Sequence, residues 1–393
     1  MAKRREENKK ISKYTKKFTI VLTNYNAEQY IEQAITSIVN QTYDKIELII
    51  TDDASKNFSK NKLEKRIKNI KNSNIVDLKF IINKNNIGTV KTLNKTLKEI
   101  TGEYVLFFAS DDILADKNTI KNYVDLFDNN DNYNIITSNW ILCDENLKIE
   151  KNFKSKNYLK KFNNKSVKRI FSSLCETNLF GAGSTCYKKK IFEKYSFDET
   201  YKYLEDWPLW LKLTRNGERI YYADFDGLLH RCGGISYNKN VSEVKKEFFK
   251  EVLYLYRNYI LKNIDDLDNN SRVKIINSYL YSAKYYSKFF DVQKDYKVIT
   301  NYINNDKKFK FSMYIYSIRP LFIIKYEELI KLNPSVPITF IINIIVDFLL
   351  VNIFKINNKY YLFLLVILLY IIIYYIVCTF LSIMASKRGK NNG

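Results

Sequence analysis

Histidine and paired cysteines are what this chain has least of. It contains one histidine, His230, and five cysteines, none of which forms a Cys-x-x-Cys pair. Zinc sites and histidine-based triads draw on several such side chains, so neither chemistry is expected here. Unpaired thiols fit a reducing compartment.

The N-terminus also lacks the apolar core of a signal peptide. Residues 1–17 form a polar, basic tail. We therefore expect the domain that follows, residues 18–237, to stay in the cytosol.

Acidic residues are outnumbered. The 393 residues include 64 Lys and Arg against 42 Asp and Glu, a formal charge of +22. No helix-turn-helix, zinc or RNA-recognition pattern accompanies this charge, so nucleic acid is not an expected partner. The basic residues are scattered through a composition rich in Lys, Asn, Ile and Tyr, and an apolar C-terminal region follows them. We therefore explain the positive charge by two causes together: attraction to anionic membrane lipid, and this compositional bias.

Short apolar segments alternate with helical patterns in the first third of the chain. Strands are predicted at 18–22, 46–50, 78–82 and 104–108, and helices begin at Asn26 and Gly88. This order favours an α/β fold with a central, mostly parallel sheet. Later segments are shorter, and we expect strands at 135–140, 220–222 and 227–230.

The run 102–112 is apolar until it ends in two adjacent acids, Asp111 and Asp112. In an open α/β sheet, ligands bind at the carboxyl ends of the strands. Adjacent carboxylates repel each other unless a cation lies beside them, and the usual cation here is Mg²⁺ or Mn²⁺ carrying a diphosphate.

The C-terminal part has a different character. Residues 238–333 are predicted to form a helical appendage that can lie against a membrane. Residues 334–393 are predicted to be a membrane region. The segment 360–384 carries no charge and is long enough to span a bilayer.

A second apolar segment, 337–354, contains Asp347. A charge at that depth is costly, so two topologies stay open. Either both segments span as a hairpin, or the first lies in the interface. The positive-inside tendency favours the hairpin, which keeps Lys387–Lys390 in the cytosol, whereas the short loop 355–359 argues against it. The expected location is a cell inner membrane or plasma membrane, with residues 18–237 on its cytoplasmic side.

Six short motifs occur in order at ordinary spacings. They are Thr23-Asn24-Tyr25-Asn26, Gln41-Thr42, Asp52-Asp53-Ala54-Ser55, Asn86-Ile87-Gly88 with Asn94, Ala109-Ser110-Asp111-Asp112, and Glu205-Asp206-Trp207. The ordered set resembles a family 2 glycosyltransferase with the GT-A, Rossmann-like nucleotide-sugar-binding fold over residues 18–237. With its C-terminal membrane segment the chain is similar to the bacterial surface-polysaccharide type.

The resemblance implies a nucleotide-sugar donor, with UDP as the expected nucleotide. The turn Thr23–Asn26 would contact the base and ribose, and Tyr25 would stack on the base. Asp53 would accept the imino proton of uracil, Asp52 would support the loop, and Gly88 would allow close packing against the nucleotide. The alternative for Asp52-Asp53 is a solvated turn at the strand end, and the alternative for Asn86-Ile87-Gly88 is a plain helix cap.

The resemblance also implies a divalent metal, Mg²⁺ or Mn²⁺, bridging the diphosphate. By position Asp112 would bind the metal, and Asp111 would contact the ribose or a metal-bound water. Ala109 departs from the family's Asp-x-Asp-Asp form and cannot bind metal. Arg231 suits the diphosphate, and His230 is either a metal ligand or a packed strand-end residue. The alternative for the acids is a helix N-cap.

Glu205 and Asp206 resemble the family's base motif. Asp206 would take the proton from an acceptor hydroxyl, and Glu205 would orient the helix or the acceptor. A single displacement with inversion follows, in the hexosyltransferase class. The alternative is that both acids complement a helix dipole. Trp207 is expected in the core, Trp210 at the acceptor wall, and the loop Phe180–Ser184 at the sugar pocket.

The leading hypothesis is a membrane-anchored, metal-dependent inverting glycosyltransferase that extends a glycan or lipid-linked glycan for capsule, lipopolysaccharide or another surface polysaccharide. A polyprenyl-phosphate sugar transferase is the alternative enzyme, although its acceptor is already ionised and needs no general base. A non-catalytic GT-A scaffold is the third hypothesis, to which Ala109 points. The sequence leaves the sugar, the linkage and the oligomeric state undetermined.

Overall fold

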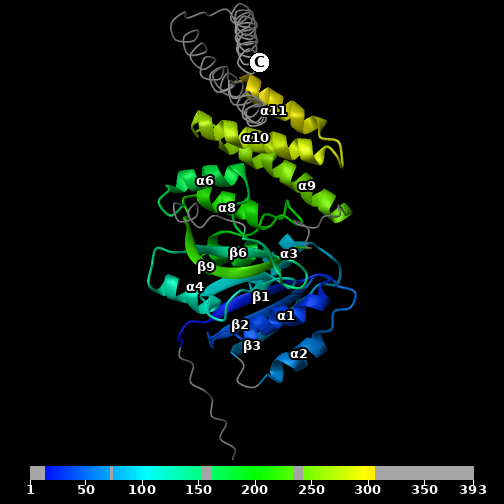
Figure 1. The fold of residues 1–393 in the computed structure, drawn as a ribbon, viewed down its shortest axis with the longest axis vertical. Coiled ribbons are helices and arrows are strands. Elements are labelled where there is room, and N and C mark those ends of the chain that lie inside the picture. The colour runs from blue at the N-terminus through cyan, green and yellow to red at the C-terminus, as the bar shows by residue number, and fades with distance from the viewer. Residues whose placement is uncertain (1–13, 71–73, 153–161, 233–241, 306–393) are drawn as a thin grey trace, which may run out of the picture. The chain divides into compact units, whose positions relative to one another are not determined.

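The computed structural model describes residues 14–70, 74–152, 162–232 and 242–305 (Figure 1). All of them lie in the first of two compact units, residues 1–306. Within these described ranges, no helix is both long and apolar enough to cross a bilayer. The membrane segments predicted at 337–354 and 360–384 lie outside the described residues.

The described chain is built around one mixed sheet. Its strand order is β3-β2-β1-β4-β8-β6-β9-β5, and β7 pairs with β6. The strands are β1 Phe18–Asn24, β2 Ile46–Asp52, β3 Ile75–Ile82, β4 Tyr104–Ala109, β5 Ile113–Leu114, β6 Ile135–Cys143, β7 Ile149–Asn152, β8 Thr185–Lys188 and β9 Ile220–Arg231.

The first four strands confirm the predicted α/β arrangement, because β3, β2, β1 and β4 are parallel neighbours. The rest of the sheet corrects the prediction of a mostly parallel one. Strand β8 runs antiparallel to β4 and β6, β5 antiparallel to β9, and β7 antiparallel to β6.

Strand β9 is a second correction. The sequence indicates two short strands, because Asp224 and Asp226 interrupt the apolar pattern. The structure has one twelve-residue strand, which pairs with β6 through two shifts of register between Thr137 and Trp140. Gly227 is required there, because a Cβ on it would lie 2.0 Å from Ser138 Oγ.

Helices cover the sheet and continue beyond it (Figure 1). They are α1 Glu28–Val39, α2 Lys60–Lys68, α3 Thr89–Leu97, α4 Thr119–Asp128, α6 Val167–Glu176, α7 Ile191–Lys194, α8 Asp206–Arg215, α9 Glu243–Leu255, α10 Asn269–Tyr286 and α11 Gln293–Asn305, with short helical turns η1 Ala182–Ser184, η2 Tyr256–Ile260 and η3 Leu261–Asn263. Helices α9, α10 and α11 lie within the predicted helical appendage of residues 238–333, whose residues 306–333 lie outside the described ones, and α10 packs on α6.

The buried strands of the parallel half place three of their following loops at one edge of the sheet. All seven residues of β2 are buried, as expected for a parallel strand covered on both faces. Helix α1 packs over the sheet with Ile31, Ala34, Ile35 and Ile38, which lie on the face that helical spacing predicts. The carboxyl ends of β1, β2 and β4 are in register through Asn24↔Asp52 and Thr23↔Ala109, so their following loops meet at one edge.

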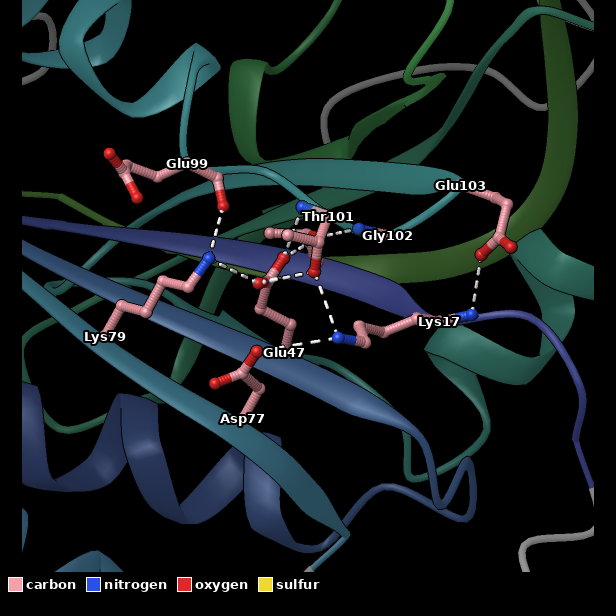
Figure 2. Close-up of polar contacts among 9 residues, drawn as sticks. Lys17, Glu47, Asp77, Lys79, Glu99, Thr101, Gly102 and Glu103 are labelled. Atoms are coloured by element: carbon pink, nitrogen blue, oxygen red, sulfur yellow. Dashed lines mark hydrogen bonds and ion pairs between the residues drawn. The ribbon is translucent and has the colours of Figure 1, made fainter.

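The amino ends of the same strands are tied by a buried carboxylate, Glu47 (Figure 2). Glu47 is fully buried and accepts hydrogen bonds from Thr19 Oγ1 at 2.6 Å, Thr101 N at 2.8 Å and Thr101 Oγ1 at 2.7 Å. It also pairs with Lys79 Nζ at 3.0 Å. Burial alone would raise the pKa of Glu47, but these donors outweigh burial and lower it to about 2.

Candidate functional site

The loops after β1, β2 and β4 share one buried hydrogen-bond cluster. Asn24 Nδ2 donates to Asp52 Oδ1 at 2.8 Å and to Ser55 Oγ at 3.1 Å. Ser110 Oγ donates to Asn24 Oδ1 at 2.8 Å. Asp52 also accepts from Ser55 N at 2.9 Å and Ser55 Oγ at 2.6 Å. Asp52 therefore supports the loop rather than facing outward.

Two residues of these loops adopt left-handed backbone, Asn26 with φ 49° and Ala54 with φ 65°. Asn26 N donates to Ser55 Oγ at 2.8 Å, which locks one loop to the other. Asparagine tolerates this conformation, whereas alanine does so at a cost. Between the fixed residues, Tyr25 is 50% exposed, so its ring is available to a flat ligand. Thr23 points Oγ1 back to Phe108 O at 3.4 Å.

Asp53 binds the loop that follows β3. Its Oδ1 accepts from Asn83 Nδ2 at 2.9 Å and Ile87 N at 2.9 Å, and its Oδ2 accepts from Gly88 N at 2.8 Å. A carboxylate offers about four acceptor positions, so Asp53 can accept one further donor, as the predicted contact with uracil requires.

Gly88 has a neighbour that the sequence did not indicate. Its φ is 90°, and a Cβ on it would lie 2.3 Å from Lys202 Cγ and 2.8 Å from Lys202 O. The close approach that Gly88 permits is therefore to Lys202, whereas the predicted approach was to the nucleotide.

The acid pair after β4 meets the end of β9. Asp112 is 3% exposed; its Oδ1 lies 2.9 Å from His230 Nδ1 and accepts from Arg231 N at 3.3 Å. Burial and the neighbouring Asp112 raise the pKa of Asp111 to about 6. Burial would lower the pKa of His230, but Asp112 and Asp111 outweigh burial and raise it to about 9.

Asp111 and Asp112 are the side chains here that could bind a divalent cation, and Asp112 would do so through Oδ2, since its Oδ1 contacts His230. Asp111 and Asp112 are adjacent carboxylates whose repulsion a cation relieves. In the part of the chain that the structure describes, no group of three or more His, Cys, Asp and Glu is arranged to hold a metal. Mg²⁺ commonly needs one or two carboxylates, and substrate phosphates and waters complete its shell. Asp112 and Asp111 are thus the residues that would hold it.

Arg231 occupies a different place from the predicted diphosphate contact. It is 2% exposed. Its Nη1 donates to Asp111 O at 2.7 Å, its Nε donates to Glu145 O at 3.3 Å, and its Nη2 donates to Gln33 Oε1. The guanidinium lies 4.6 Å from the ring centroid of Tyr30. Arg231 therefore holds the main chain of the acid pair in place from inside the protein.

The small-residue loop Phe180–Ser184 lies beside Asp112, and its place at the sugar pocket stays a prediction. A Cβ on Gly183 would lie 3.5 Å from Asp112 Oδ2, and one on Gly181 would lie 3.1 Å from the Trp140 ring. Five residues before Gly183, Asn178 contacts Asp206. Five residues of chain span at most about 18 Å. The segment 178–183 therefore runs from the contact with Asp206 to the neighbourhood of Asp112 within that length.

The predicted base motif lies at the start of α8. Asp206 Oδ2 accepts from Asn178 Nδ2 at 3.1 Å, and Asp206 Oδ1 accepts from Trp207 N at 2.6 Å. Burial raises the pKa of Asp206 above its usual range. Burial and the charge of Asp206 raise the pKa of Glu205 to about 8. The two hydrogen-bond donors to Asp206 favour its ionised form, so Asp206 is the better proton acceptor of the pair.

The two tryptophans of this helix are both structural. Trp207 is buried and donates Nε1 to Leu174 O at 2.7 Å, which confirms its expected place in the core. Trp210 is fully buried and donates Nε1 to Tyr187 OH at 2.7 Å. The expectation that Trp210 forms the acceptor wall is wrong, because its ring has no surface left to offer.

Two residues near the base escaped sequence reasoning. Asn178 holds Asp206, and Glu251 of α9 accepts three main-chain N–H groups just before Glu205. Neither belongs to a local motif. Each meets its partner over 28 or more residues of chain, and a single sequence carries no signal for such pairs.

Known proteins with similar sequences are glycosyltransferases or teichoic acid biosynthesis proteins. Residues 19–196 match the model of Glycosyl transferase family 2. An uncharacterized glycosyltransferase of Haemophilus influenzae is 27% identical over 321 residues, 72% of this chain and 96% of that protein. The minor teichoic acid biosynthesis protein GgaB of Bacillus subtilis is 30% identical over 266 residues, 66% of this chain and 27% of that protein.

A solved structure shows the same fold. The crystal structure of S. aureus TarS 1–349 in complex with UDP-GlcNAc has a TM-score of 0.52 at 20% identity, and the match covers 74% of this chain and 80% of that one. The prediction of a GT-A-like α/β fold is thereby confirmed, with a mixed sheet.

Proposed function

We propose that this chain, a glycosyltransferase whose residues 19–196 match the model of Glycosyl transferase family 2, is a metal-dependent inverting enzyme. It transfers a sugar from a UDP-sugar to a hydroxyl of a glycan or lipid-linked glycan. The observation that carries this proposal is the carboxyl pair at the start of α8, where Asp206 accepts a hydrogen bond from Asn178 Nδ2 at 3.1 Å.

The proposed reaction is one displacement. The acceptor oxygen attacks the anomeric carbon, its proton passes to Asp206, and the bond to the diphosphate breaks with its electron pair on the departing nucleotide. Since no covalent enzyme intermediate forms, the configuration at the anomeric carbon inverts.

The donor would lie along the carboxyl ends of β1, β2 and β4. Tyr25 stacks on the base, and Asp53 accepts the imino proton of uracil. UDP-GlcNAc, bound in the TarS structure, is a donor of this class. Asp112 and Asp111 would hold Mg²⁺ or Mn²⁺, which supplies neutralisation of the charge on the leaving diphosphate.

A hydroxyl acceptor fits this site better than a lipid phosphate. A phosphate is already ionised at neutral pH and needs no base, whereas a hydroxyl must lose its proton as it bonds. The relative GgaB is named for minor teichoic acid biosynthesis, which supports a role in surface polysaccharide synthesis. We further propose that residues 334–393 anchor the chain to the membrane, with the domain on its cytoplasmic side.

Transfer by Asp206→Asn tests this function. The whole chain is first screened for thermal stabilisation by nucleotide sugars in the presence of Mn²⁺. The donor that stabilises it is then used to measure sugar transfer to glycan acceptors. General bases contribute about 10²–10⁴-fold, so Asp206→Asn should lose at least about 10²-fold in kcat and keep the wild-type affinity for UDP. The exposed Asp131→Asn is the matched control. Retained turnover in Asp206→Asn would contradict the assignment, and retention of anomeric configuration in the product would exclude a single displacement.

A further inference from the structure

Glu251 of α9 binds three consecutive main-chain N–H groups. Its Oε1 accepts from Lys202 N at 2.7 Å, and its Oε2 accepts from Tyr203 N at 3.0 Å and from Leu204 N at 3.0 Å. The next residue along the chain is Glu205. One carboxylate on a helix far along the sequence thus fixes the turn that leads into the base pair.

The same turn contacts the loop that Asp53 binds. Lys202 O accepts from Val90 N at 3.2 Å, and Gly88 approaches Lys202 closely enough to leave no room for a Cβ. Gly88 N in turn donates to Asp53 Oδ2 at 2.8 Å. Lys202 therefore joins the proposed nucleotide contact to the turn that carries the proposed base.

Helix α9 does not depend on Glu251 for its position. Leu253 and Leu255 are 1% and 0% exposed, and Phe249 is 5% exposed. Tyr254 makes an edge contact with Tyr201, with ring centroids 5.8 Å apart. Buried apolar surface is the main stabilising contribution to such a helix, so the helix can stay in place when the carboxylate is changed.

We propose that Glu251 is a positioning residue for the transfer reaction: from a helix outside the matched family segment, it holds the Lys202–Leu204 turn so that Asp206 meets the acceptor. The inference rests on the proposed function. Hydrogen bonds to a carboxylate are about twice as strong as neutral ones. Without them the turn has three N–H groups to satisfy elsewhere, and the base can shift.

The size of the effect follows from geometry. A misplacement of about 1 Å can cost on the order of 10²-fold in rate. Nucleotide binding depends on loops that remain tied through Asp53, Asn24 and Ser110, so it should change little. A positioning role therefore predicts a loss in kcat that is separate from any loss in UDP affinity.

The test uses Glu251→Gln in the whole chain, because glutamine keeps the shape but presents an amide that opposes one N–H. Glu247→Gln is the matched control. It lies four residues earlier on α9, is exposed, and pairs only with Lys250 in the described residues. We expect Glu251→Gln to lower kcat by about 10–100-fold, with the Kd for UDP within twofold of wild type, while Glu247→Gln is unchanged in both. Hydrogen exchange of the 202–204 amides should quicken in Glu251→Gln alone.

The outcomes separate this inference from the function itself. If wild type neither binds UDP nor transfers sugar, the proposed function fails whatever the variants do. If wild type is active and Glu251→Gln equals Glu247→Gln, the positioning role is excluded. The role is also excluded if kcat and UDP affinity fall in proportion, or if the 202–204 amides exchange at the wild-type rate.

Discussion

Asn178 donates its side-chain amide to Asp206 at 3.1 Å, and this contact links the segment after α6 to the first residue of α8. The donor stabilises the ionised carboxylate and so opposes the effect of burial, which raises the pKa of Asp206. The protonation state of the proposed base thus depends on a residue that no motif contains.

Asn178→Leu should shift the pH profile of the reaction. Loss of the donor raises the pKa of Asp206 further, so the base stays protonated to higher pH and the acid limb of kcat moves upward. Loss of a hydrogen bond to a charged group corresponds to about 1.5–3 kcal/mol, or about one to two pH units. The measurement is kcat against pH. Thr177→Val, at an exposed neighbour, is the control, and an unmoved acid limb in Asn178→Leu would contradict the assignment.

Glu47→Gln should destabilise the fold by about 2–3 kcal/mol, because it removes the charge that Thr19, Thr101 and Lys79 surround. Glu47 has a folded pKa of about 2, below the unfolded value of about 4.3. A depressed folded pKa stabilises the fold above the unfolded pKa, and this contribution is lost as pH falls from about 4.3 toward 2.

Urea unfolding of wild type and Glu47→Gln at several pH values checks this. The difference in unfolding free energy should be full at pH 7 and should shrink below pH 4. Glu99→Gln is a useful control, because Lys79 contacts the Glu99 main-chain carbonyl, and the Glu99 side chain is exposed (Figure 2). A difference that does not change with pH would mean that the carboxylate charge is not responsible.

The sequence predicted the first half of the sheet because its signals are local there. Strands at 18–22, 46–50 and 104–108 are apolar runs, and each ends in a polar motif that the structure brings to one edge. Strand β8 escaped prediction, because four residues, Thr185–Lys188, with polar ends carry too little hydrophobic pattern. Its antiparallel pairing with β4 and β6, together with those of β5 with β9 and of β7 with β6, makes the sheet mixed.

The site residues likewise fall into those that the sequence could name and those whose role only the fold shows. Asp111 and Asp112 could be named because they end an apolar run, and Glu205 and Asp206 because they resemble the family's base motif. The role of Arg231 could not be inferred, since only the fold shows that its guanidinium is buried against Asp111 O. Contacts between residues that lie far apart in the sequence, such as Arg231 and Asp111, become visible only in the structure.

Ala54→Gly should stabilise the fold without harming the site. Ala54 has φ 65°, a conformation that costs a non-glycine residue about 1–2 kcal/mol. Glycine relieves this strain but loses about 0.5–1 kcal/mol in chain entropy, so a net gain of up to about 1 kcal/mol is expected. Urea unfolding measures it, and UDP affinity should stay unchanged. Ala34→Gly, inside α1, should lower stability by about 1 kcal/mol or more. A loss of stability in Ala54→Gly would show that the turn is not strained.

Removal of divalent metal should weaken UDP binding, because the diphosphate would then approach the carboxylates of Asp111 and Asp112, whose charge the cationic neighbour of Asp112, His230, offsets only in part. Calorimetry of the whole chain should give a Kd for UDP at least about tenfold higher in EDTA than in Mn²⁺, equal to about 1.4 kcal/mol. Asp112→Asn should lose most of the Mn²⁺ dependence, so its UDP affinity should differ much less between EDTA and Mn²⁺ than that of the wild type. Asp131→Asn should behave as wild type. Equal affinity of the wild type in EDTA and in Mn²⁺ would show that this acid pair does not serve a metal, and Asp112 would then act mainly as the partner of His230 at 2.9 Å.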